Sequence, residues 1–216
     1  MERFFPKSKL VLTGNPVRSS ILAASSDQSK ARAFFDLDPA KTTLFVLGGS
    51  LGARRINELI ASRLDYFRGL GLQLIWQCGR LYYDTYKEYD SASIRVLDFV
   101  NKMELAYDSA DMIISRAGAS SVSELCLVGK AVLFIPSPNV AEDHQTKNAQ
   151  ALADKGAALL IRESELEERF ETLFSRLAGS PEERSALGRA IKELALPKAT
   201  EHIADQIEGL IKRIDN

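Results

Sequence analysis

The segment GGSLGARRIN (48–57) combines two features that suit a phosphate group. It follows a strongly apolar run and opens a helical pattern, and Ser50 adds a hydroxyl there. Glycines allow a tight turn in which backbone N–H groups approach a ligand closely. The free N–H groups at a helix start attract anions. The segment lacks the Lys-Ser/Thr of a Walker loop and the G-x-G-x-x-G spacing, so it gives little support for NAD. A strand-to-helix turn without a ligand is the alternative.

A second candidate is Arg18, which lies in the segment TGNPVRSSI (13–21). Gly14, Asn15 and Pro16 form a turn signal after an apolar run. A guanidinium just past a strand end could donate a forked pair of hydrogen bonds to a diphosphate. A surface arginine that binds nothing explains the same residues equally well.

A third candidate is Glu124, in the segment SRAGASSVSEL (115–125). Ser121 and Glu124 have the S-x-x-E spacing of a capping box, in which the carboxylate bonds back to the start of its own helix. The same carboxylate could instead accept hydrogen bonds from the vicinal hydroxyls of a ribose. The spacing leaves both roles open. In either case we expect Gly118 to be required for the turn.

A fourth polar segment, PSPNVAEDHQTKNAQAL (136–152), leads from an apolar run into a helix. Its amide and imidazole groups could bind sugar hydroxyls, although Asp143 could serve only as an N-cap. His144 and His202 are the two histidines of the chain, and neither has the spacing of a metal site. We therefore expect no metal. No nucleophile–base motif accompanies these loops, so we assign no catalytic residue.

Apolar β-branched runs alternate with helical patterns along the chain, as expected for βαβ units around a parallel sheet. Strands are expected at 9–14, 42–49, 72–79, 94–99, 111–115, 131–136 and 157–161. Helices are expected near 52–66, 81–89, 102–109, 120–129 and 143–154. The prediction is a Rossmann-like doubly wound α/β fold. Its ligands bind beyond the carboxyl ends of the strands, where the four polar segments lie.

The chain is expected to end in a helical tail, at about 163–216. Ser180 has the position of an N-cap and Pro181 that of a first helical residue. A last helix is expected at about 199–213. We find no internal repeat and no second core.

Composition excludes several classes of protein. With 216 residues and 45% hydrophobic residues, the chain can bury a sizeable core. The formal net charge of -1 argues against a general nucleic-acid binder. Cys78 and Cys126 lie in apolar segments, which favours reduced core thiols in a cytosolic protein. We expect no signal peptide, and no apolar run reaches the roughly 20 residues of a membrane-spanning helix.

The four polar segments together resemble the carboxyl-terminal half of the MurG family, the bacterial glycosyltransferases that make lipid II. The resemblance is close over about residues 6–162 and looser in the helical tail. The matching stretches are TGNPVR, LGGSLGARRIN, ISRAGASSVSEL and EDHQTKNA, with WQCGR and FVNKMELAYDSADMIISRAG between them. The resemblance implies the GT-B architecture, of which this chain would be the carboxyl-terminal half.

The resemblance also implies roles for individual residues toward a UDP-N-acetylglucosamine donor. Arg18 and Ser50 would contact the diphosphate, and the backbone of Val100 would read the uracil. Glu124 would hold the ribose hydroxyls, and Gln145 would bind the N-acetylglucosamine ring. The nucleotide and sugar would also be lined by Ala119, Ser120, Ser121, Val122 and Ser123. Further candidates are Asn15, Gly49, Asn57 and His144.

The sequence departs from the family in lacking the amino-terminal half, which carries the acceptor site, the expected catalytic base and a membrane-facing patch. We expect residues 1–8 to be a remnant of the interdomain connector and residues 9–216 to form the UDP-sugar-binding domain. The isolated chain would bind donor without transferring the sugar, and it would need no cofactor. Its partners would be an amino-terminal acceptor domain, fused or separate, and through it a lipid-linked acceptor. Together they would act in peptidoglycan synthesis as a peripheral protein at the inner face of the cell membrane.

Two other functions fit the same features. The chain could be a separate donor subunit or binding module of a split glycosyltransferase. It could also be a domain of a sugar-nucleotide epimerase of related architecture.

Overall fold

The computed structural model describes residues 5–22 and 27–214 of the chain. Its centre is one parallel six-stranded sheet with the strand order β3-β2-β1-β4-β5-β6. In the central register, Phe45 lies between Ile75 and Ile113. The strands are β1 Thr43–Leu47, β2 Gln73–Gln77, β3 Ile94–Leu97, β4 Met112–Ser115, β5 Ala131–Phe134 and β6 Leu159–Leu160. The doubly wound α/β fold and six of the seven predicted strands are therefore confirmed.

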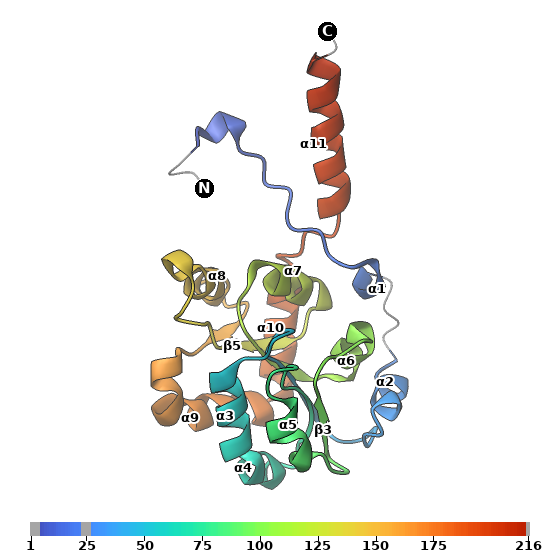
Figure 1. Ribbon diagram of the computed structural model, residues 1–216, viewed down its shortest axis with the longest axis vertical. Coiled ribbons are helices and arrows are strands. Elements are labelled where there is room, and N and C mark those ends of the chain that lie inside the picture. The colour runs from blue at the N-terminus through green and yellow to red at the C-terminus, as the bar shows by residue number, and fades with distance from the viewer. Residues whose placement is uncertain (1–4, 23–26, 215–216) are drawn as a thin grey trace.

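Helices cover both faces of the sheet (Figure 1). The α-helices are α1 Ser19–Leu22, α2 Gln28–Phe34, α3 Arg54–Ser62, α4 Leu64–Gly69, α5 Tyr83–Tyr86, α6 Met103–Ser109, α7 Ala119–Val128, α8 His144–Ala153, α9 Leu166–Gly179, α10 Pro181–Lys192 and α11 Ala199–Ile214. Short 3-10 helices are η1 Lys7–Lys9, η2 Lys87–Tyr89, η3 Ala141–Asp143 and η4 Glu163–Glu165. The helix predicted at 52–66 is divided into α3 and α4, and Ser180 caps α10 as expected, accepting the Glu183 N–H.

The sheet divides the core into two clusters because successive side chains of a strand point to opposite faces. On β1, Leu44 and Val46 pack into the cluster under α3, α4 and α9. Phe45 and Leu47 pack into the cluster under α6, α7 and α8. All five residues of β1 are buried, as expected for a central parallel strand covered on both faces.

The strand predicted at 9–14 is wrong. Lys7–Lys9 form η1, and the residues that follow have no regular structure. The side chain of Leu12 is 87% exposed. A β-branched apolar run becomes a strand only beside a partner, and this segment leaves the body of the molecule (Figure 1). The connector predicted at 1–8 lies partly outside the described residues, and η1 crosses its predicted end.

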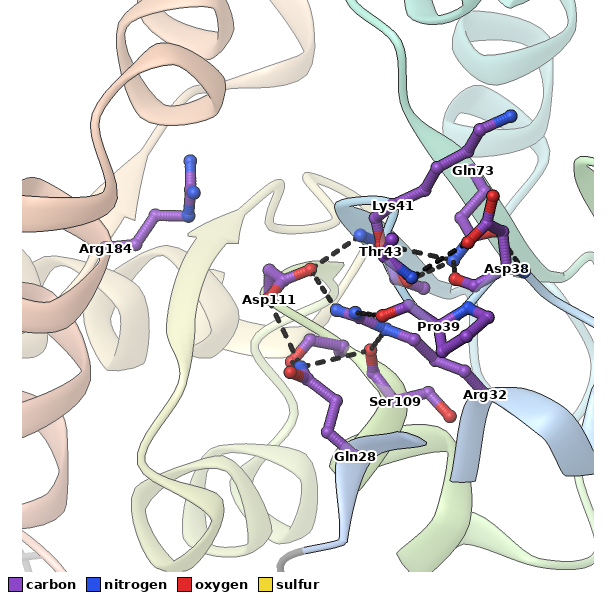
Figure 2. Close-up of polar contacts among 12 residues, drawn as sticks. Gln28, Arg32, Asp38, Pro39, Lys41, Thr43, Gln73, Ser109, Asp111 and Arg184 are labelled. Carbon is purple, nitrogen blue, oxygen red and sulfur yellow. Dashed lines mark hydrogen bonds and ion pairs between the residues drawn. The ribbon is translucent and has the colours of Figure 1, made fainter. Parts of the chain in front are cut away.

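Asp111 joins α2 to the amino-terminal edge of the sheet (Figure 2). One of its carboxylate oxygens accepts from Arg32 Nη2 and from the Thr43 N–H, each at 2.6 Å. The other oxygen accepts from Gln28 Nε2 at 3.2 Å. Arg32 also donates to the carbonyl of Pro39 at 2.7 Å. This cluster connects α2 to the starts of β1 and β4.

Both cysteines lie in the core, as predicted. Burial raises the pKa of the Cys78 thiol to about 11 and raises that of Cys126 as well. Both thiols are therefore protonated at neutral pH. In the part of the chain that the structure describes, no helix has the length and apolar character needed to span a membrane.

Candidate functional site

Two cavities meet at the carboxyl-terminal edge of the sheet. The small cavity, about 270 Å³, is lined by Arg18, Leu47, Gly49, Ser50, Gln77, Phe99, Met103, Ser120, Ser121 and Glu124. The large cavity, about 660 Å³, is lined by Gly48, Gly49, Gly52, Ala53, Arg54, Arg55, Glu58, Arg116, Gly118, Ser121, Ser137, Asn139, Gln145 and Glu163. The two share Gly49 and Ser121. The structure thus divides one site into two compartments joined at a glycine turn and a helix start.

The amino-terminal end of α7 lies at this junction. Its first internal hydrogen bond runs from the Val122 N–H to the Gly118 carbonyl. The N–H groups of the first three helical residues, Ala119 to Ser121, therefore have no acceptor within the helix. The start of α3 lines the large cavity. The first hydrogen bond within α3 runs from the Asn57 N–H to the Ala53 carbonyl, so the N–H groups before Asn57 also have no acceptor within their helix. An anion at the junction would face the positive ends of both helices.

The loop between β1 and α3 is held in shape by glycines. Gly52 and Gly79 have φ values of +86° and +89°, which L side chains rarely adopt. A Cβ on Gly52 would lie 2.1 Å from the Cys78 carbonyl oxygen, and one on Gly79 would lie 2.2 Å from the Gly52 nitrogen. The loop after β1 therefore packs backbone to backbone against the loop after β2. The prediction for 48–57 did not include Gly79, because that contact joins segments far apart in sequence.

Glu124 does not form the capping box, which was one of the two roles that its spacing left open. The N-cap of α7 is Gly118, so Glu124 lies in the second turn of the helix rather than opposite an N-cap serine. Its Oε1 accepts from Arg18 Nε at 3.0 Å, and its Oε2 accepts from the Tyr107 hydroxyl at 3.2 Å. The residue is 8% exposed and lines the small cavity. The structure thus brings Arg18 and Glu124 together, from positions that spacing alone could not connect.

Gly118 itself is not required for the turn, contrary to the prediction. Its φ of -64° is open to any residue, and a Cβ there would lie 3.9 Å from Ser121 Oγ.

Gln77, at the end of β2, connects two of the predicted positions. Its Nε2 donates to the Gly49 carbonyl at 3.0 Å, and its Oε1 accepts from the Val100 N–H at 3.0 Å. Val100 is 2% exposed, packs in the core and lines neither cavity. The walls of the small cavity near Val100 are the side chains of Phe99 and Met103, which the sequence prediction missed.

Gln145 lines the large cavity, and its Oε1 accepts from the Ser137 N–H at 3.0 Å. This bond orients the side-chain amide nitrogen as the group available to a ligand. Asp143 holds the N-cap position of α8 but accepts from the Thr146 hydroxyl at 2.6 Å rather than from a backbone N–H. His144 is exposed and bonds back to the Ala141 carbonyl at 2.8 Å, so its ring is not part of the cavity wall.

Several other candidates lie away from both cavities. Asn57 is fully buried, donates to the Cys78 carbonyl at 2.8 Å and accepts from Trp76 Nε1 at 2.9 Å, so it is part of the core. The residues that line a separate groove on another side of α7 include Asn15, Val122 and Ser123. Ala119 lines neither cavity with its side chain, and its carbonyl accepts from the Asn15 and Ser123 side chains.

A charged pair in the large cavity was also missed. Arg116 Nη2 and Glu163 Oε1 are 2.5 Å apart, and both side chains are mostly buried. Arg116 also donates to the Ile135 carbonyl at 2.9 Å. Arg116 directly follows β4. Its position at the end of a predicted strand could have marked it as a candidate site residue. Among the described residues, no group of three or more His, Cys, Asp or Glu side chains could hold a metal ion.

A doubly wound sheet with glycine turns and helix starts around a divided cavity is the arrangement in which one class of α/β domain binds nucleotides. The family model described as the glycosyltransferase family 28 C-terminal domain matches residues 43–206. The chain belongs to this family. This confirms the expectation of a carboxyl-terminal GT-B domain that was based on the four polar segments.

Two relatives match almost the whole chain. One, from Flavobacterium psychrophilum, is 50% identical over 213 residues, which is 98% of this chain and 58% of the relative. Another, from Christiangramia forsetii, is 55% identical over 207 residues, 96% of this chain and 57% of the relative. Both are named UDP-N-acetylglucosamine--N-acetylmuramyl-(pentapeptide) pyrophosphoryl-undecaprenol N-acetylglucosamine transferase. The crystal structure of Acinetobacter baumannii MurG superimposes with a TM-score of 0.75 at 32% identity, covering 95% of this chain and 58% of that one. The chain therefore spans somewhat more than half the length of these proteins.

Proposed function

We propose that this chain is the donor-binding part of an inverting N-acetylglucosaminyltransferase and that it binds UDP-N-acetylglucosamine. The divided cavity carries the proposal. The small cavity, with Phe99, Met103 and Glu124, suits a uridine, and the large cavity, with Gln145, suits the sugar. The diphosphate would lie at the junction, between Arg18 and the start of α7.

This arrangement suits the chemistry of glycosyl transfer. Breaking the bond between the anomeric carbon and the diphosphate leaves additional negative charge on UDP. The helix starts, together with the Arg18 guanidinium, would stabilise that charge more in the transition state than in the ground state. An acceptor hydroxyl would attack the opposite face of the anomeric carbon with the aid of a general base. We assign that base to the part of the enzyme that this chain does not span.

The remaining part of the enzyme would pack against α11. That helix projects from the body on the side where the segment before α1 also leaves it (Figure 1). Its exposed apolar side chains are Ile207, Leu210 and Ile211, each more than half exposed. We propose that the amino-terminal acceptor domain covers them and that the assembled enzyme converts lipid I to lipid II. Because the acceptor named for the relatives is carried by a lipid, the enzyme would work as a peripheral protein at the inner face of the cell membrane.

Calorimetric titration of the purified chain tests the donor assignment. We expect it to bind UDP-N-acetylglucosamine, UDP-glucose and UDP, and to transfer no sugar to a lipid acceptor until an amino-terminal part is added. The absence of heat with every uridine nucleotide would refute the proposal. Repeated turnover by the chain alone would refute the assignment of the base. Formation of the 2-epimer of the donor would indicate an epimerase instead.

Gln145→Ala is expected to weaken binding of UDP-N-acetylglucosamine about 5- to 10-fold, the effect of losing one hydrogen bond. Binding of UDP should change less than about twofold, because Gln145 does not line the small cavity. Gln150→Ala is the matched control, since Gln150 is an exposed amide of the same helix that bonds Asp154. An equal loss for UDP and for the sugar donor would show that Gln145 does not bind the sugar.

A further inference from the structure

The carboxylate of Glu124 is held from inside the protein by a tyrosine. The Tyr107 hydroxyl donates to Glu124 Oε2 at 3.2 Å, while Arg18 donates to Oε1 at 3.0 Å from the side of the cavity. Tyr107 is 2% exposed, whereas the Arg18 side chain is 47% exposed. Glu124 therefore accepts hydrogen bonds from one buried donor, Tyr107, and from one partly exposed donor, Arg18.

Tyr107 is itself fixed by the core. It lies on α6, and its ring packs edge-on against Phe45 of β1, with ring centroids 5.6 Å apart at 71°. Burial, and then the neighbouring charge of Glu124, raise the pKa of the Tyr107 phenol. The phenol therefore keeps its proton at every working pH and can only donate to the carboxylate.

The remaining hydrogen-bonding capacity of Glu124 matches a vicinal diol. An ionised carboxylate has about four acceptor positions on its two oxygens. Arg18 occupies one acceptor position on Oε1, and Tyr107 occupies one on Oε2. Each oxygen therefore keeps one acceptor position for a ribose hydroxyl. A carboxylate free to rotate would lose conformational entropy when it presents both of these positions to the same diol.

We propose that Tyr107 is a positioning residue that fixes the Glu124 carboxylate for recognition of the ribose. The proposal rests on the proposed function, because it assumes that the small cavity takes a uridine nucleotide. Tyr107 does not line the cavity and acts only through Glu124. Its contribution should therefore appear in the preference for ribose over deoxyribose and should vanish when Glu124 is removed.

The test compares UDP with 2′-deoxy-UDP by titration calorimetry. We expect the unmodified chain to prefer UDP by about 10- to 30-fold, the effect of one hydrogen bond to a charged group. Tyr107→Phe should reduce this preference to about threefold or less, with little change in binding of 2′-deoxy-UDP. In a Glu124→Ala background, Tyr107→Phe should have no further effect on the preference.

Tyr66→Phe is the matched control. Its hydroxyl also makes protein hydrogen bonds, to the Glu171 carbonyl and Ser175, but it lies on α4 away from the cavity. This variant should keep the full preference for UDP even if its melting temperature falls. A crystal structure of the unmodified chain with UDP gives a reading independent of variant stability, with Tyr107 still bonded to Glu124 and Glu124 bonded to the ribose.

The outcomes separate the two proposals. If the chain binds no uridine nucleotide, the proposed function fails. If it binds UDP but Tyr107→Phe keeps the full preference for ribose, or if the unmodified chain shows no preference, the role of Tyr107 is refuted while donor binding stands.

Discussion

Replacing Arg18 with alanine is expected to weaken binding of UDP by about 30- to 100-fold. The loss of a charged partner at a ligand diphosphate typically has an effect of this size. The loss is enlarged here because Arg18 also pairs with Glu124. Without the guanidinium, that carboxylate would remain unbalanced beside the anionic ligand. Binding of uridine, which carries no phosphate, should change by only about threefold.

Arg18→Lys separates charge from geometry. It keeps the positive charge but loses the forked donor, so we expect an intermediate affinity for UDP. Arg68→Ala is the control, since Arg68 lies on α4 and forms a surface pair with Asp65. Titrations at two salt concentrations complete the measurement. Equal losses for UDP and uridine on changing Arg18 to Ala would contradict a phosphate contact.

Asp111→Ala is expected to lower the free energy of unfolding by about 3 kcal/mol, since breaking a buried ion pair costs about 3–5 kcal/mol and Asp111 is partly exposed. The substitution leaves the Arg32 guanidinium buried without its carboxylate, because only 7% of that side chain is exposed. It also removes the acceptor of the Thr43 N–H and one of the three acceptors of Gln28 Nε2 (Figure 2). Urea unfolding followed by circular dichroism measures the change.

Two variants calibrate this result. Asp65→Ala removes a carboxylate that is 96% exposed and should change stability by less than about 0.5 kcal/mol. Asp111→Asn keeps an oxygen for the Thr43 N–H but loses the charge. Its free energy of unfolding should therefore lie between that of Asp111→Ala and that of the unmodified chain. A drop below about 1 kcal/mol for Asp111→Ala would show that the network contributes little to folding.

The sheet could be predicted from the sequence because its four central strands, β1, β2, β4 and β5, are buried on both faces and therefore form largely apolar runs. The run at 9–14 also contains consecutive apolar residues, Leu10 to Leu12, but it has no partner strand, and composition cannot show whether a partner exists. Helix starts were predicted well where the cap is local, as at Ser180. At α7 the helix predicted at 120–129 agrees with the observed Ala119–Val128, but the capping box that the S-x-x-E spacing of Ser121 allowed does not form, because the N-cap is Gly118.

The site could be predicted only in part, because contacts between distant segments leave no local pattern in the sequence. The glycine turn and Gln145 belong to single segments, and the structure places both on cavity walls. The partners of Glu124 could not be read from spacing, since Arg18 and Tyr107 are 106 and 17 residues away in sequence. Asn57 has a polar side chain next to a candidate loop, yet its buried contact with Trp76 depends on packing that no local pattern reveals.

The contact between Gly52 and Gly79 has a mechanical consequence. With the two backbones touching, the turn that carries Gly49 and Ser50 cannot shift without displacing the turn that follows β2. The turns after β1 and β2 would therefore move together. A pocket with such a rim has its shape before any molecule enters it. We therefore expect the rim to need little ordering on binding, and a side chain on Gly52 or Gly79 to distort it.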